Sequence, residues 1–336
     1  MYHRALHRFA LLTAVSTFLL IFVGGLVTST GSGLSVPDWP TTYGQNMFTF
    51  PIDQWVGGIK YEHGHRLFAS LVGFLTVILT VWVALKEERR WVKWLTFYAL
   101  GAVILQGILG GLTVLFLLPT AISVSHGMLA QTFFCAVSTI ALVTSKWWID
   151  QKDSIGSEKN KFLQNISIIT ALMVFIQLAL GAILRHTYSG LSIPEYPLAY
   201  GQILPSLDPD SIRSYNQHLI DIGMKWAGDK PVATYQIVLH LLHRYWAIAV
   251  TGMVLFLGFR LRSLGEPSGI LRKHGTLLWT MVIIQFTLGI FTVLTRKEVI
   301  ITSLHVDIGA LVLMTTVLTA VRIARFRWVS NDRESR

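Results

Sequence analysis

Apolar residues are gathered along the chain into long continuous runs, and short polar segments separate these runs. A transmembrane helix requires roughly 20 predominantly apolar residues. The pattern therefore predicts eight membrane-spanning helices at residues 9–27, 63–85, 94–118, 122–145, 162–184, 235–259, 276–294 and 300–321. The composition agrees, because 52% of the residues are hydrophobic, only 14% are charged and the mean hydropathy is +0.54.

The first span resembles a signal peptide, because His3, Arg4 and Arg8 precede its apolar core. The core is longer than that of a usual signal sequence, and the segment has a counterpart later in the chain. We therefore interpret it as a membrane anchor.

The charged residues follow the spans. The formal net charge is +10, but the Lys and Arg residues lie mainly between the spans, so they indicate membrane topology and no nucleic-acid partner. Most of them fall on the side of both termini, which predicts cytoplasmic termini. The single cysteine, Cys135, lies inside an apolar run, which excludes an intrachain disulfide and a cysteine metal cluster.

The chain is also a tandem repeat. The segment Gly-Leu-Ser-Val-Pro-Asp-Trp-Pro at residues 33–40 recurs as Gly-Leu-Ser-Ile-Pro-Glu-Tyr-Pro at residues 190–197, and both are interpreted as structural turns or as lids over pockets. Further matches pair His65-Arg66 with His243-Arg244, His126 with His305, Gln106 with Gln285 and Gly110 with Gly289. The spacing of the matches places an insertion in the second outer loop, at residues 204–231.

Each copy contains an even number of spans, so both copies run in the same direction across the membrane. We therefore predict an all-α integral membrane protein whose eight transmembrane helices form two pseudo-symmetric four-helix bundles, as a tandem parallel repeat. The expected boundaries are an N-terminal half at residues 1–150, a cytoplasmic linker at 151–159 and a C-terminal half at 160–328.

Four histidines lie near the outer ends of the even-numbered spans, two in each repeat: His65, His126, His243 and His305. An ionisable side chain inside a membrane is costly and indicates function, and two imidazoles from facing helices suit the axial positions of a haem iron. A histidine at a helix end also suits a hydrogen bond to a carbonyl, but four in register favour ligation. A zinc site matches less well, because zinc draws several ligands together in a tetrahedron.

The residues beside these histidines are also informative. Arg66 and Arg244 are candidate contacts for haem propionates, although an arginine at a helix end also suits lipid phosphates. Glu62 breaks the symmetry, because the repeat places His240 at its position. A residue three before His65 shares its helix face, so Glu62 is the candidate proton-handling catalytic group. The alternative is a carboxylate stabilised by the helix dipole.

Together these motifs resemble the haem A synthase family, the membrane enzymes of cytochrome-oxidase assembly in bacteria and mitochondria. The resemblance covers nearly the whole chain. It rests on Glu-x-x-His-Arg at residues 62–66, on His243-Arg244, His126 and His305, and on the Gly-Ser-Gly-Leu-Ser-x-Pro-Asp-Trp-Pro loop from Gly31. The resemblance implies two hydroxylations of the C8 methyl of haem O, after which loss of water leaves the formyl group of haem A.

The resemblance also implies a role for each half. The N-terminal half would hold the substrate haem between His65 and His126, with Glu62 as the catalytic residue, and the C-terminal half would hold an electron-transferring haem b between His243 and His305. Candidate partners are membrane lipid, a haem O synthase, a quinol or other electron donor and a second copy of the chain. The expected location is the bacterial cell membrane, or the inner mitochondrial membrane in a eukaryote, with the haem sites near the outer face.

The chain departs from the family in its outer loops. Many relatives carry a cysteine pair in the first loop and some carry one in the second, whereas this chain has Val36 and Thr42, and Ile193 and Ala199, at the matching positions. A relay of reducing equivalents through these cysteines is therefore excluded.

Two other functions remain open from the sequence. A non-catalytic di-haem b-type membrane electron-transfer protein would explain the four histidines but would leave Glu62 without a task. A transporter built on parallel repeats would explain the symmetry and Glu62, but it would need no haem.

Overall fold

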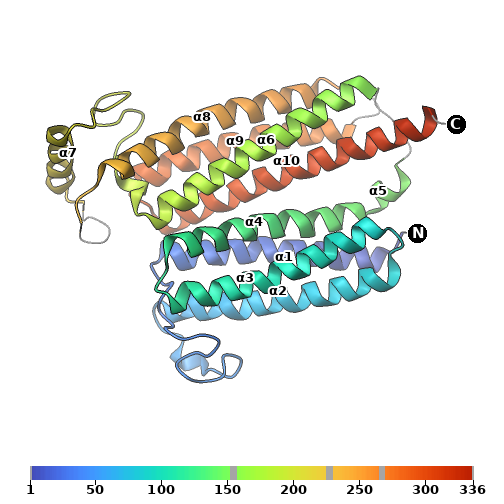
Figure 1. The fold of residues 1–336 in the computed structure, drawn as a ribbon, viewed down its shortest axis with the longest axis horizontal. Helices are drawn as coiled ribbons and strands as arrows, with labels where there is room; N and C mark the ends of the chain where they lie inside the picture. The colour runs from blue at the N-terminus through green and yellow to red at the C-terminus, as the bar shows by residue number, and fades with distance from the viewer. Residues whose placement is uncertain (1, 152–156, 225–229, 265–268, 335–336) are drawn as a thin grey trace.

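The computed structural model describes residues 2–151, 157–224, 230–264 and 269–334, and it is built almost entirely of helices (Figure 1). Within these residues there is no β-strand, only two isolated bridges in loops. Among the described residues, eight helices are long and apolar enough to cross a membrane. They are α1 (Arg4–Ser29), α2 (Ile59–Lys86), α3 (Arg90–Leu115), α4 (Thr120–Val143), α6 (Ser157–His186), α8 (Thr234–Arg262), α9 (Gly269–Leu294) and α10 (Val299–Glu334). The prediction of an all-α, multi-pass membrane protein is confirmed.

Two predicted spans were wrong at their ends. The span at 94–118 runs past α3, because the chain turns at Leu117 and Leu118, whose φ angles are 57° and 59°. The N–H of Leu118 donates to the carbonyl of Thr113 at 2.7 Å and closes the turn. Hydropathy missed this end because the turn is itself apolar.

The span at 122–145 also runs past its helix. Helix α4 ends at Val143, and Ser145 instead caps the short helix α5 (Lys146–Asp150) by accepting the N–H of Trp148 at 3.2 Å. Of the predicted linker at 151–159, residues 152–156 lie outside the described residues, and α6 already begins at Ser157.

The spanning helices form two groups (Figure 1). In the first, α1 and α3 each pack against α2 and α4, and in the second, α6 and α9 each pack against α8 and α10. The groups meet where α10 packs on α1 and α4, and where α4 packs on α6. This packing supports two four-helix halves, while their relation as a tandem repeat stays a prediction from the sequence.

Each group has its own apolar core. Val72, Leu79 and Val137 are fully buried in the first core, and Leu257 and Leu271 in the second. Both termini lie at one end of the molecule, and the long loops between α1 and α2 and between α6 and α8 lie at the other (Figure 1). The loops of both halves therefore face the same side of the membrane, as an even number of crossings per half requires.

The insertion in the second loop contains a helix that the sequence did not predict, α7 (Pro209–Asp221). Asp208 caps it by accepting the N–H groups of Asp210 and Ser211. Tyr215 of α7 stacks on Tyr200 of the preceding loop, with ring centroids 3.8 Å apart. Burial, together with the neighbouring Tyr215 and Glu195, raises the pKa of Tyr200. The insertion is thus packed onto the second outer loop, with no counterpart in the first.

Candidate functional site

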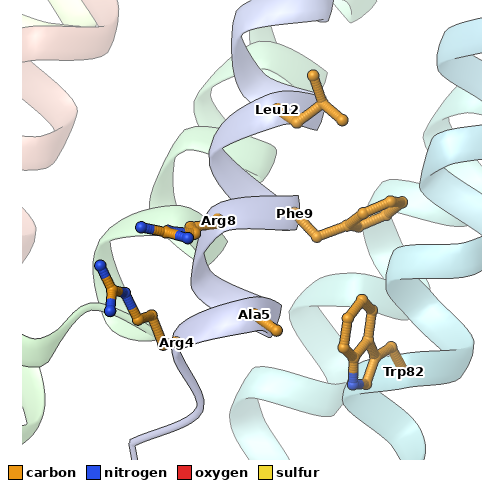
Figure 2. Close-up of a pocket in the computed structure, with 6 residues that line it drawn as sticks. All are labelled: Arg4, Ala5, Arg8, Phe9, Leu12 and Trp82. Atoms are coloured by element: carbon orange, nitrogen blue, oxygen red, sulfur yellow. The ribbon is translucent and has the colours of Figure 1, made fainter.

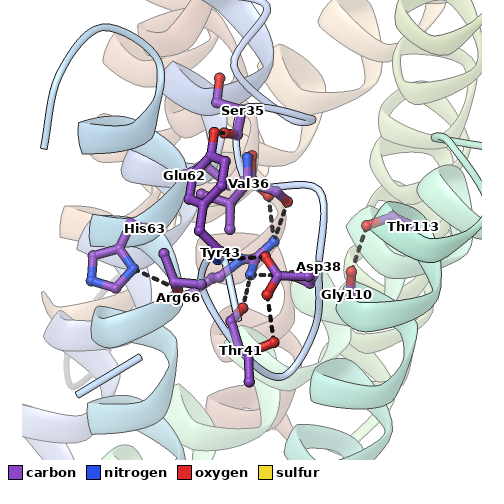
Figure 3. Close-up of polar contacts among 11 residues, drawn as sticks. Ser35, Val36, Asp38, Thr41, Tyr43, Glu62, His63, Arg66, Gly110 and Thr113 are labelled. Atoms are coloured by element: carbon purple, nitrogen blue, oxygen red, sulfur yellow. Dashed lines mark hydrogen bonds and ion pairs between the residues drawn. The ribbon is translucent and has the colours of Figure 1, made fainter. Parts of the chain in front are cut away.

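The beginning of α2 brings Glu62 and Arg66 against the first outer loop (Figure 3). The carboxylate of Glu62 accepts the backbone N–H of Val36 through Oε2 at 2.8 Å, and its Oε1 lies 2.6 Å from Nη2 of Arg66. The side chain of Glu62 is 5% exposed. Because Glu62 and Arg66 are four residues apart, they face the same side of the helix, and together they tie the loop to the mouth of α2.

Arg66 contributes most of this tie. Its guanidinium donates to the backbone carbonyls of Val36 at 2.8 Å, Asp38 at 2.7 Å and Thr41 at 3.1 Å (Figure 3). Only a rigid, planar fork of donors can reach acceptors placed this way. In this arrangement the guanidinium of Arg66 binds the backbone of the first outer loop.

Arg244 makes the same contacts in the second half. It donates to the backbone carbonyls of Ile193 at 3.2 Å, Glu195 at 2.6 Å and Leu198 at 3.2 Å, the three positions that match the acceptors of Arg66 in the repeat. Its Nε is buried and has no hydrogen-bond partner among the described residues. Propionate binding by either arginine stays a prediction.

His63 and His240 lie in the same helix mouths but are buried against the outer loops. His63 is 0% exposed, its Nδ1 lies 3.0 Å from the hydroxyl of Thr42, and Trp55 packs edge-on against its ring. His240 is 2% exposed and its Nδ1 lies 3.4 Å from Oγ of Ser192. Both imidazoles therefore contact the outer loops. At the position that Glu62 and His240 share in the repeat, the side chain contacts a loop in each half.

The four candidate ligand histidines differ from these two because each remains partly exposed. Each of their rings also lies against a glycine of the preceding spanning helix, so that a methyl group on that glycine would come within 3.0–3.2 Å of the ring carbon Cε1. The pairs are Gly24 with His65, Gly110 with His126, Gly181 with His243 and Gly289 with His305. Small residues of this kind let helices and bulky groups approach closely inside a membrane.

The histidines are brought together two by two. His65 is a neighbour of His126 in the first half, and His243 is a neighbour of His305 in the second half. Within the described ranges, no three His, Cys, Asp or Glu side chains converge on a common metal position. Paired imidazoles on facing helices fit the two axial positions of a haem iron, and the buried, unpartnered Nδ1 atoms of His65 and His126 leave these rings uncommitted within the described part of the protein.

Several residues of this site were missed by the sequence reasoning. Gly24 and Gly181 were not singled out, although both occupy the same place in the repeat. Gln177 was also missed; its side-chain nitrogen lies 3.2 Å from both ring nitrogens of His243. Asp307 is 3% exposed, and an isolated carboxylate inside an apolar run was a signal that could have identified it.

One further pocket, of about 470 Å³, lies at the opposite end of the first half (Figure 2). It is formed by the beginning of α1 and by Trp82 near the end of α2, and its lining residues are Arg4, Ala5, Arg8, Phe9, Leu12 and Trp82. Because α2 begins near the histidines and ends at this pocket, the two sites are separated by most of the length of a spanning helix.

Eight apolar helices with two pairs of glycine-backed imidazoles at one end define a multi-pass membrane protein whose candidate chemistry lies in those imidazoles. The chain belongs to the cytochrome oxidase assembly protein family (COX15-CtaA), whose model matches residues 7–60 and 47–318.

Individual relatives agree with this assignment. The chain is similar to the haem A synthase of Halalkalibacterium halodurans, with 26% identity over 328 residues that cover 96% of this chain and 97% of that protein. It is similar to the haem A synthase of Alkalihalophilus pseudofirmus, with 25% identity covering 94% and 98%. It is also similar to the haem A synthase of Sphingopyxis alaskensis, with 25% identity covering 96% and 92%.

Proposed function

We propose that this chain is an enzyme of haem A synthesis that oxidises the C8 methyl of haem O to a formyl group by successive hydroxylations. Family membership and the names of the full-length relatives support the reaction. The observation that carries the proposal is one asymmetry between two otherwise matching helix mouths. Glu62, a carboxylate, stands in the first, and His240 stands in the second.

The histidine pairs divide the two haems between the halves. His65 and His126 hold the substrate haem, and His243 and His305 hold haem b. Haem O supplies the methyl group that is oxidised, and haem b supplies electron transfer. The partly exposed rings and the glycines behind them support this assignment, because they leave an imidazole edge available in each half.

Glu62 is the proton-handling group of the first half. It lies three residues before His65, which is within one helical turn, and the ion pair with Arg66 fixes where its carboxylate stands. An electron-transferring haem needs no such group, and His240 supplies no carboxylate in the second half. The half that carries out the reaction thus has a carboxylate at its helix mouth, and the half that transfers electrons has none.

One observation favours a second candidate function, a non-catalytic di-haem b-type electron-transfer protein. Both carboxylate oxygens of Glu62 already have partners, in the loop and in Arg66. A purely structural Glu62 would make these same contacts, and the histidines would then serve two electron-transferring haems.

Haem extraction after co-expression with a haem O source distinguishes the two functions. We expect the native protein to yield haem A, and Glu62→Gln to retain haem b but to yield no haem A, because an amide still accepts the N–H of Val36 but exchanges no proton. Glu195→Gln is the matched control: Glu195 accepts the N–H of Gly201 at 2.7 Å in the second loop, and its variant should yield haem A normally.

The other outcomes are equally informative. Normal haem A formation by Glu62→Gln would remove Glu62 from the reaction. A protein that carries two haems but never yields haem A would establish the electron-transfer function. A reduced-minus-oxidised spectrum without any haem signal would exclude both functions.

A further inference from the structure

The two histidine pairs differ in what their ring nitrogens contact. In the second half, Nδ1 of His305 lies 3.2 Å from the backbone carbonyl of Gln285, and the ring nitrogens of His243 both lie 3.2 Å from the side-chain amide of Gln177. In the first half, Nδ1 of His65 and Nδ1 of His126 are buried without any hydrogen-bond partner among the described residues. Ring nitrogens of the second pair thus have polar neighbours, whereas the Nδ1 atoms of the first pair have none among the described residues.

Gln177, which contacts the ring of His243, stands at a position that is a glutamine in most of the helices that carry a ring-backing glycine. A glutamine stands four residues, about one helical turn, before the ring-backing glycine in three of the four helices: Gln106 before Gly110, Gln177 before Gly181 and Gln285 before Gly289. The exception is α1, where Leu20 precedes Gly24. The ring beside α1 is that of His65, so the exception falls on the candidate ligand of the substrate haem.

Gln177 is able to support His243 when that imidazole binds a metal. A histidine that ligates through one nitrogen carries a proton on the other, and it donates this proton to a neighbouring oxygen, which fixes the orientation of the ring and raises its basicity. Oε1 of Gln177 is buried and has no partner among the described residues. The oxygen and nitrogen of an amide exchange places by a half-turn, so Gln177 has an acceptor available at the distance of either ring nitrogen.

Leu20 offers no acceptor. It is partly buried against the core of the first half, and its side chain contains no polar atom. In addition, the amide nitrogen of Gln106 donates to the backbone carbonyl of His126 at 2.9 Å and not to that ring. At the position where His243 has Gln177, His65 therefore has only an apolar side chain, so the clearest difference between the halves lies at His65.

We infer that Gln177 is a positioning residue that makes the second half retain its haem, and that Leu20, at the matching place, leaves the first half able to release its haem. The inference rests on the proposed function, in which the second haem is a resident cofactor and the first is a substrate that must leave as product. The two positions would thereby set which haem stays and which is exchanged.

The test compares Gln177→Leu with native protein, as purified full-length chain. Loss of the acceptor should raise the midpoint potential of the second haem, because a less basic imidazole stabilises the ferric iron less. It should also speed transfer of that haem to apomyoglobin roughly tenfold, the lower end of the effect of removing such an outer contact. Gln177→Glu, which keeps an acceptor, should restore slow transfer.

The matched control is Gln131→Leu. Gln131 is another intramembrane glutamine and is 7% exposed; within the described residues its Oε1 has no partner, and its side chain makes no hydrogen bond to a candidate ligand. Its variant should match the native potential and transfer rate. The reciprocal change, Leu20→Gln, is measured in the His243→Ala background, where only the first pair remains, and it should slow haem loss from that pair roughly tenfold.

The outcomes separate the inference from the proposed function. If native protein binds haem at both pairs but Gln177→Leu keeps the native potential and transfer rate, the inference is overturned and the proposed function stands. Equal changes in Gln177→Leu and Gln131→Leu would also overturn it, because the effect would then belong to any buried glutamine. Native protein without haem at either pair would overturn both.

Discussion

The two outer loops are held by matching arginines, but the side chains beside those arginines differ between the halves. Arg66 and Arg244 each donate to three carbonyls at matching positions, which makes the two helix mouths close copies of each other. Beside this shared support stand Glu62 in one mouth and His240 in the other. The comparison teaches that the contacts that build the scaffold are repeated, while the groups able to exchange protons or hold a ligand ring are where the halves diverge.

The largest expected effect comes from removing a ligand. His243→Ala or His305→Ala should deplete haem b, and His65→Ala or His126→Ala should deplete only the substrate haem, because each haem iron would lose one of its two axial groups. Haem content by pyridine haemochrome, separated by chromatography, measures this. Depletion of the substrate haem by the second-half variants would reverse the assignment of the halves.

The next effect comes from the glycines that back the rings. Gly24→Ala and Gly181→Ala each place a methyl group 3.1 Å from Cε1 of the neighbouring histidine, so the ring must move or the helices must separate. Overpacking of this kind costs about 1–3 kcal/mol. We expect each variant to lose occupancy of its own haem by several-fold in a haem titration. Gly252→Ala is the control, since nothing lies within 4 Å of the added methyl; equal losses in all three variants would contradict the role of the glycines.

A smaller effect on haem content is expected from the arginines, because they hold the outer loops and not the histidine rings. A lysine in place of Arg66 or Arg244 cannot reach three carbonyls at once, and a hydrogen bond to a charged group contributes about 1.5–3 kcal/mol. Arg66→Lys should loosen its loop more than Arg244→Lys, because Arg66 also pairs with Glu62 at 2.6 Å. Hydrogen exchange of the loop amides at 36–44 and 193–201 compares the two. An equal increase in both loops would show that the ion pair with Glu62 adds nothing.

The smallest effect is a pH dependence of the first loop. Burial, the largest influence, acts to raise the pKa of Asp38, but hydrogen bonds from the N–H of Gly44, the hydroxyl of Thr41 and the N–H of Tyr43 outweigh it and hold the pKa below its ordinary value of 3.8. The carboxylate therefore stabilises the loop above about pH 4, and this stabilisation is lost as the pH falls through the folded pKa.

Exchange of the Tyr43 and Gly44 amides, corrected for intrinsic rates, should accordingly rise on acidification below that pH. Asp38→Asn serves as the control, because it removes the titrating group. Unchanged pH dependence in this variant would assign the effect to another group.

Much of the fold could be predicted from the sequence, because transfer of apolar side chains out of water dominates a membrane protein and depends on local composition. The eight spans were located in this way. Their ends were predicted less well: α3 stops at Leu115 within an apolar stretch, where only backbone hydrogen bonding distinguishes helix from turn. The helix α7 escaped prediction because it is short and polar and lies in an insertion without a repeat partner.

The candidate site was predicted in part. The repeat identified His65 and its three counterparts, since a match between two segments of the sequence can be found without knowing the fold. It did not reveal that Arg66 binds loop carbonyls, because the acceptors are backbone atoms, which every residue carries and no sequence pattern marks. Nor did it reveal the role of Gly24, which depends on a ring carried by another helix.

By itself, then, the sequence determined that this protein crosses the membrane repeatedly and carries imidazoles in two matching pairs. The tertiary structure decided which of those imidazoles are sealed into loops, which lie against glycines, and which have a hydrogen-bond partner, as His243 has in Gln177. The physical reason is range. Burial of apolar surface is encoded residue by residue along the chain, whereas a hydrogen bond or a close contact exists only between atoms that packing brings within about 3 Å of each other.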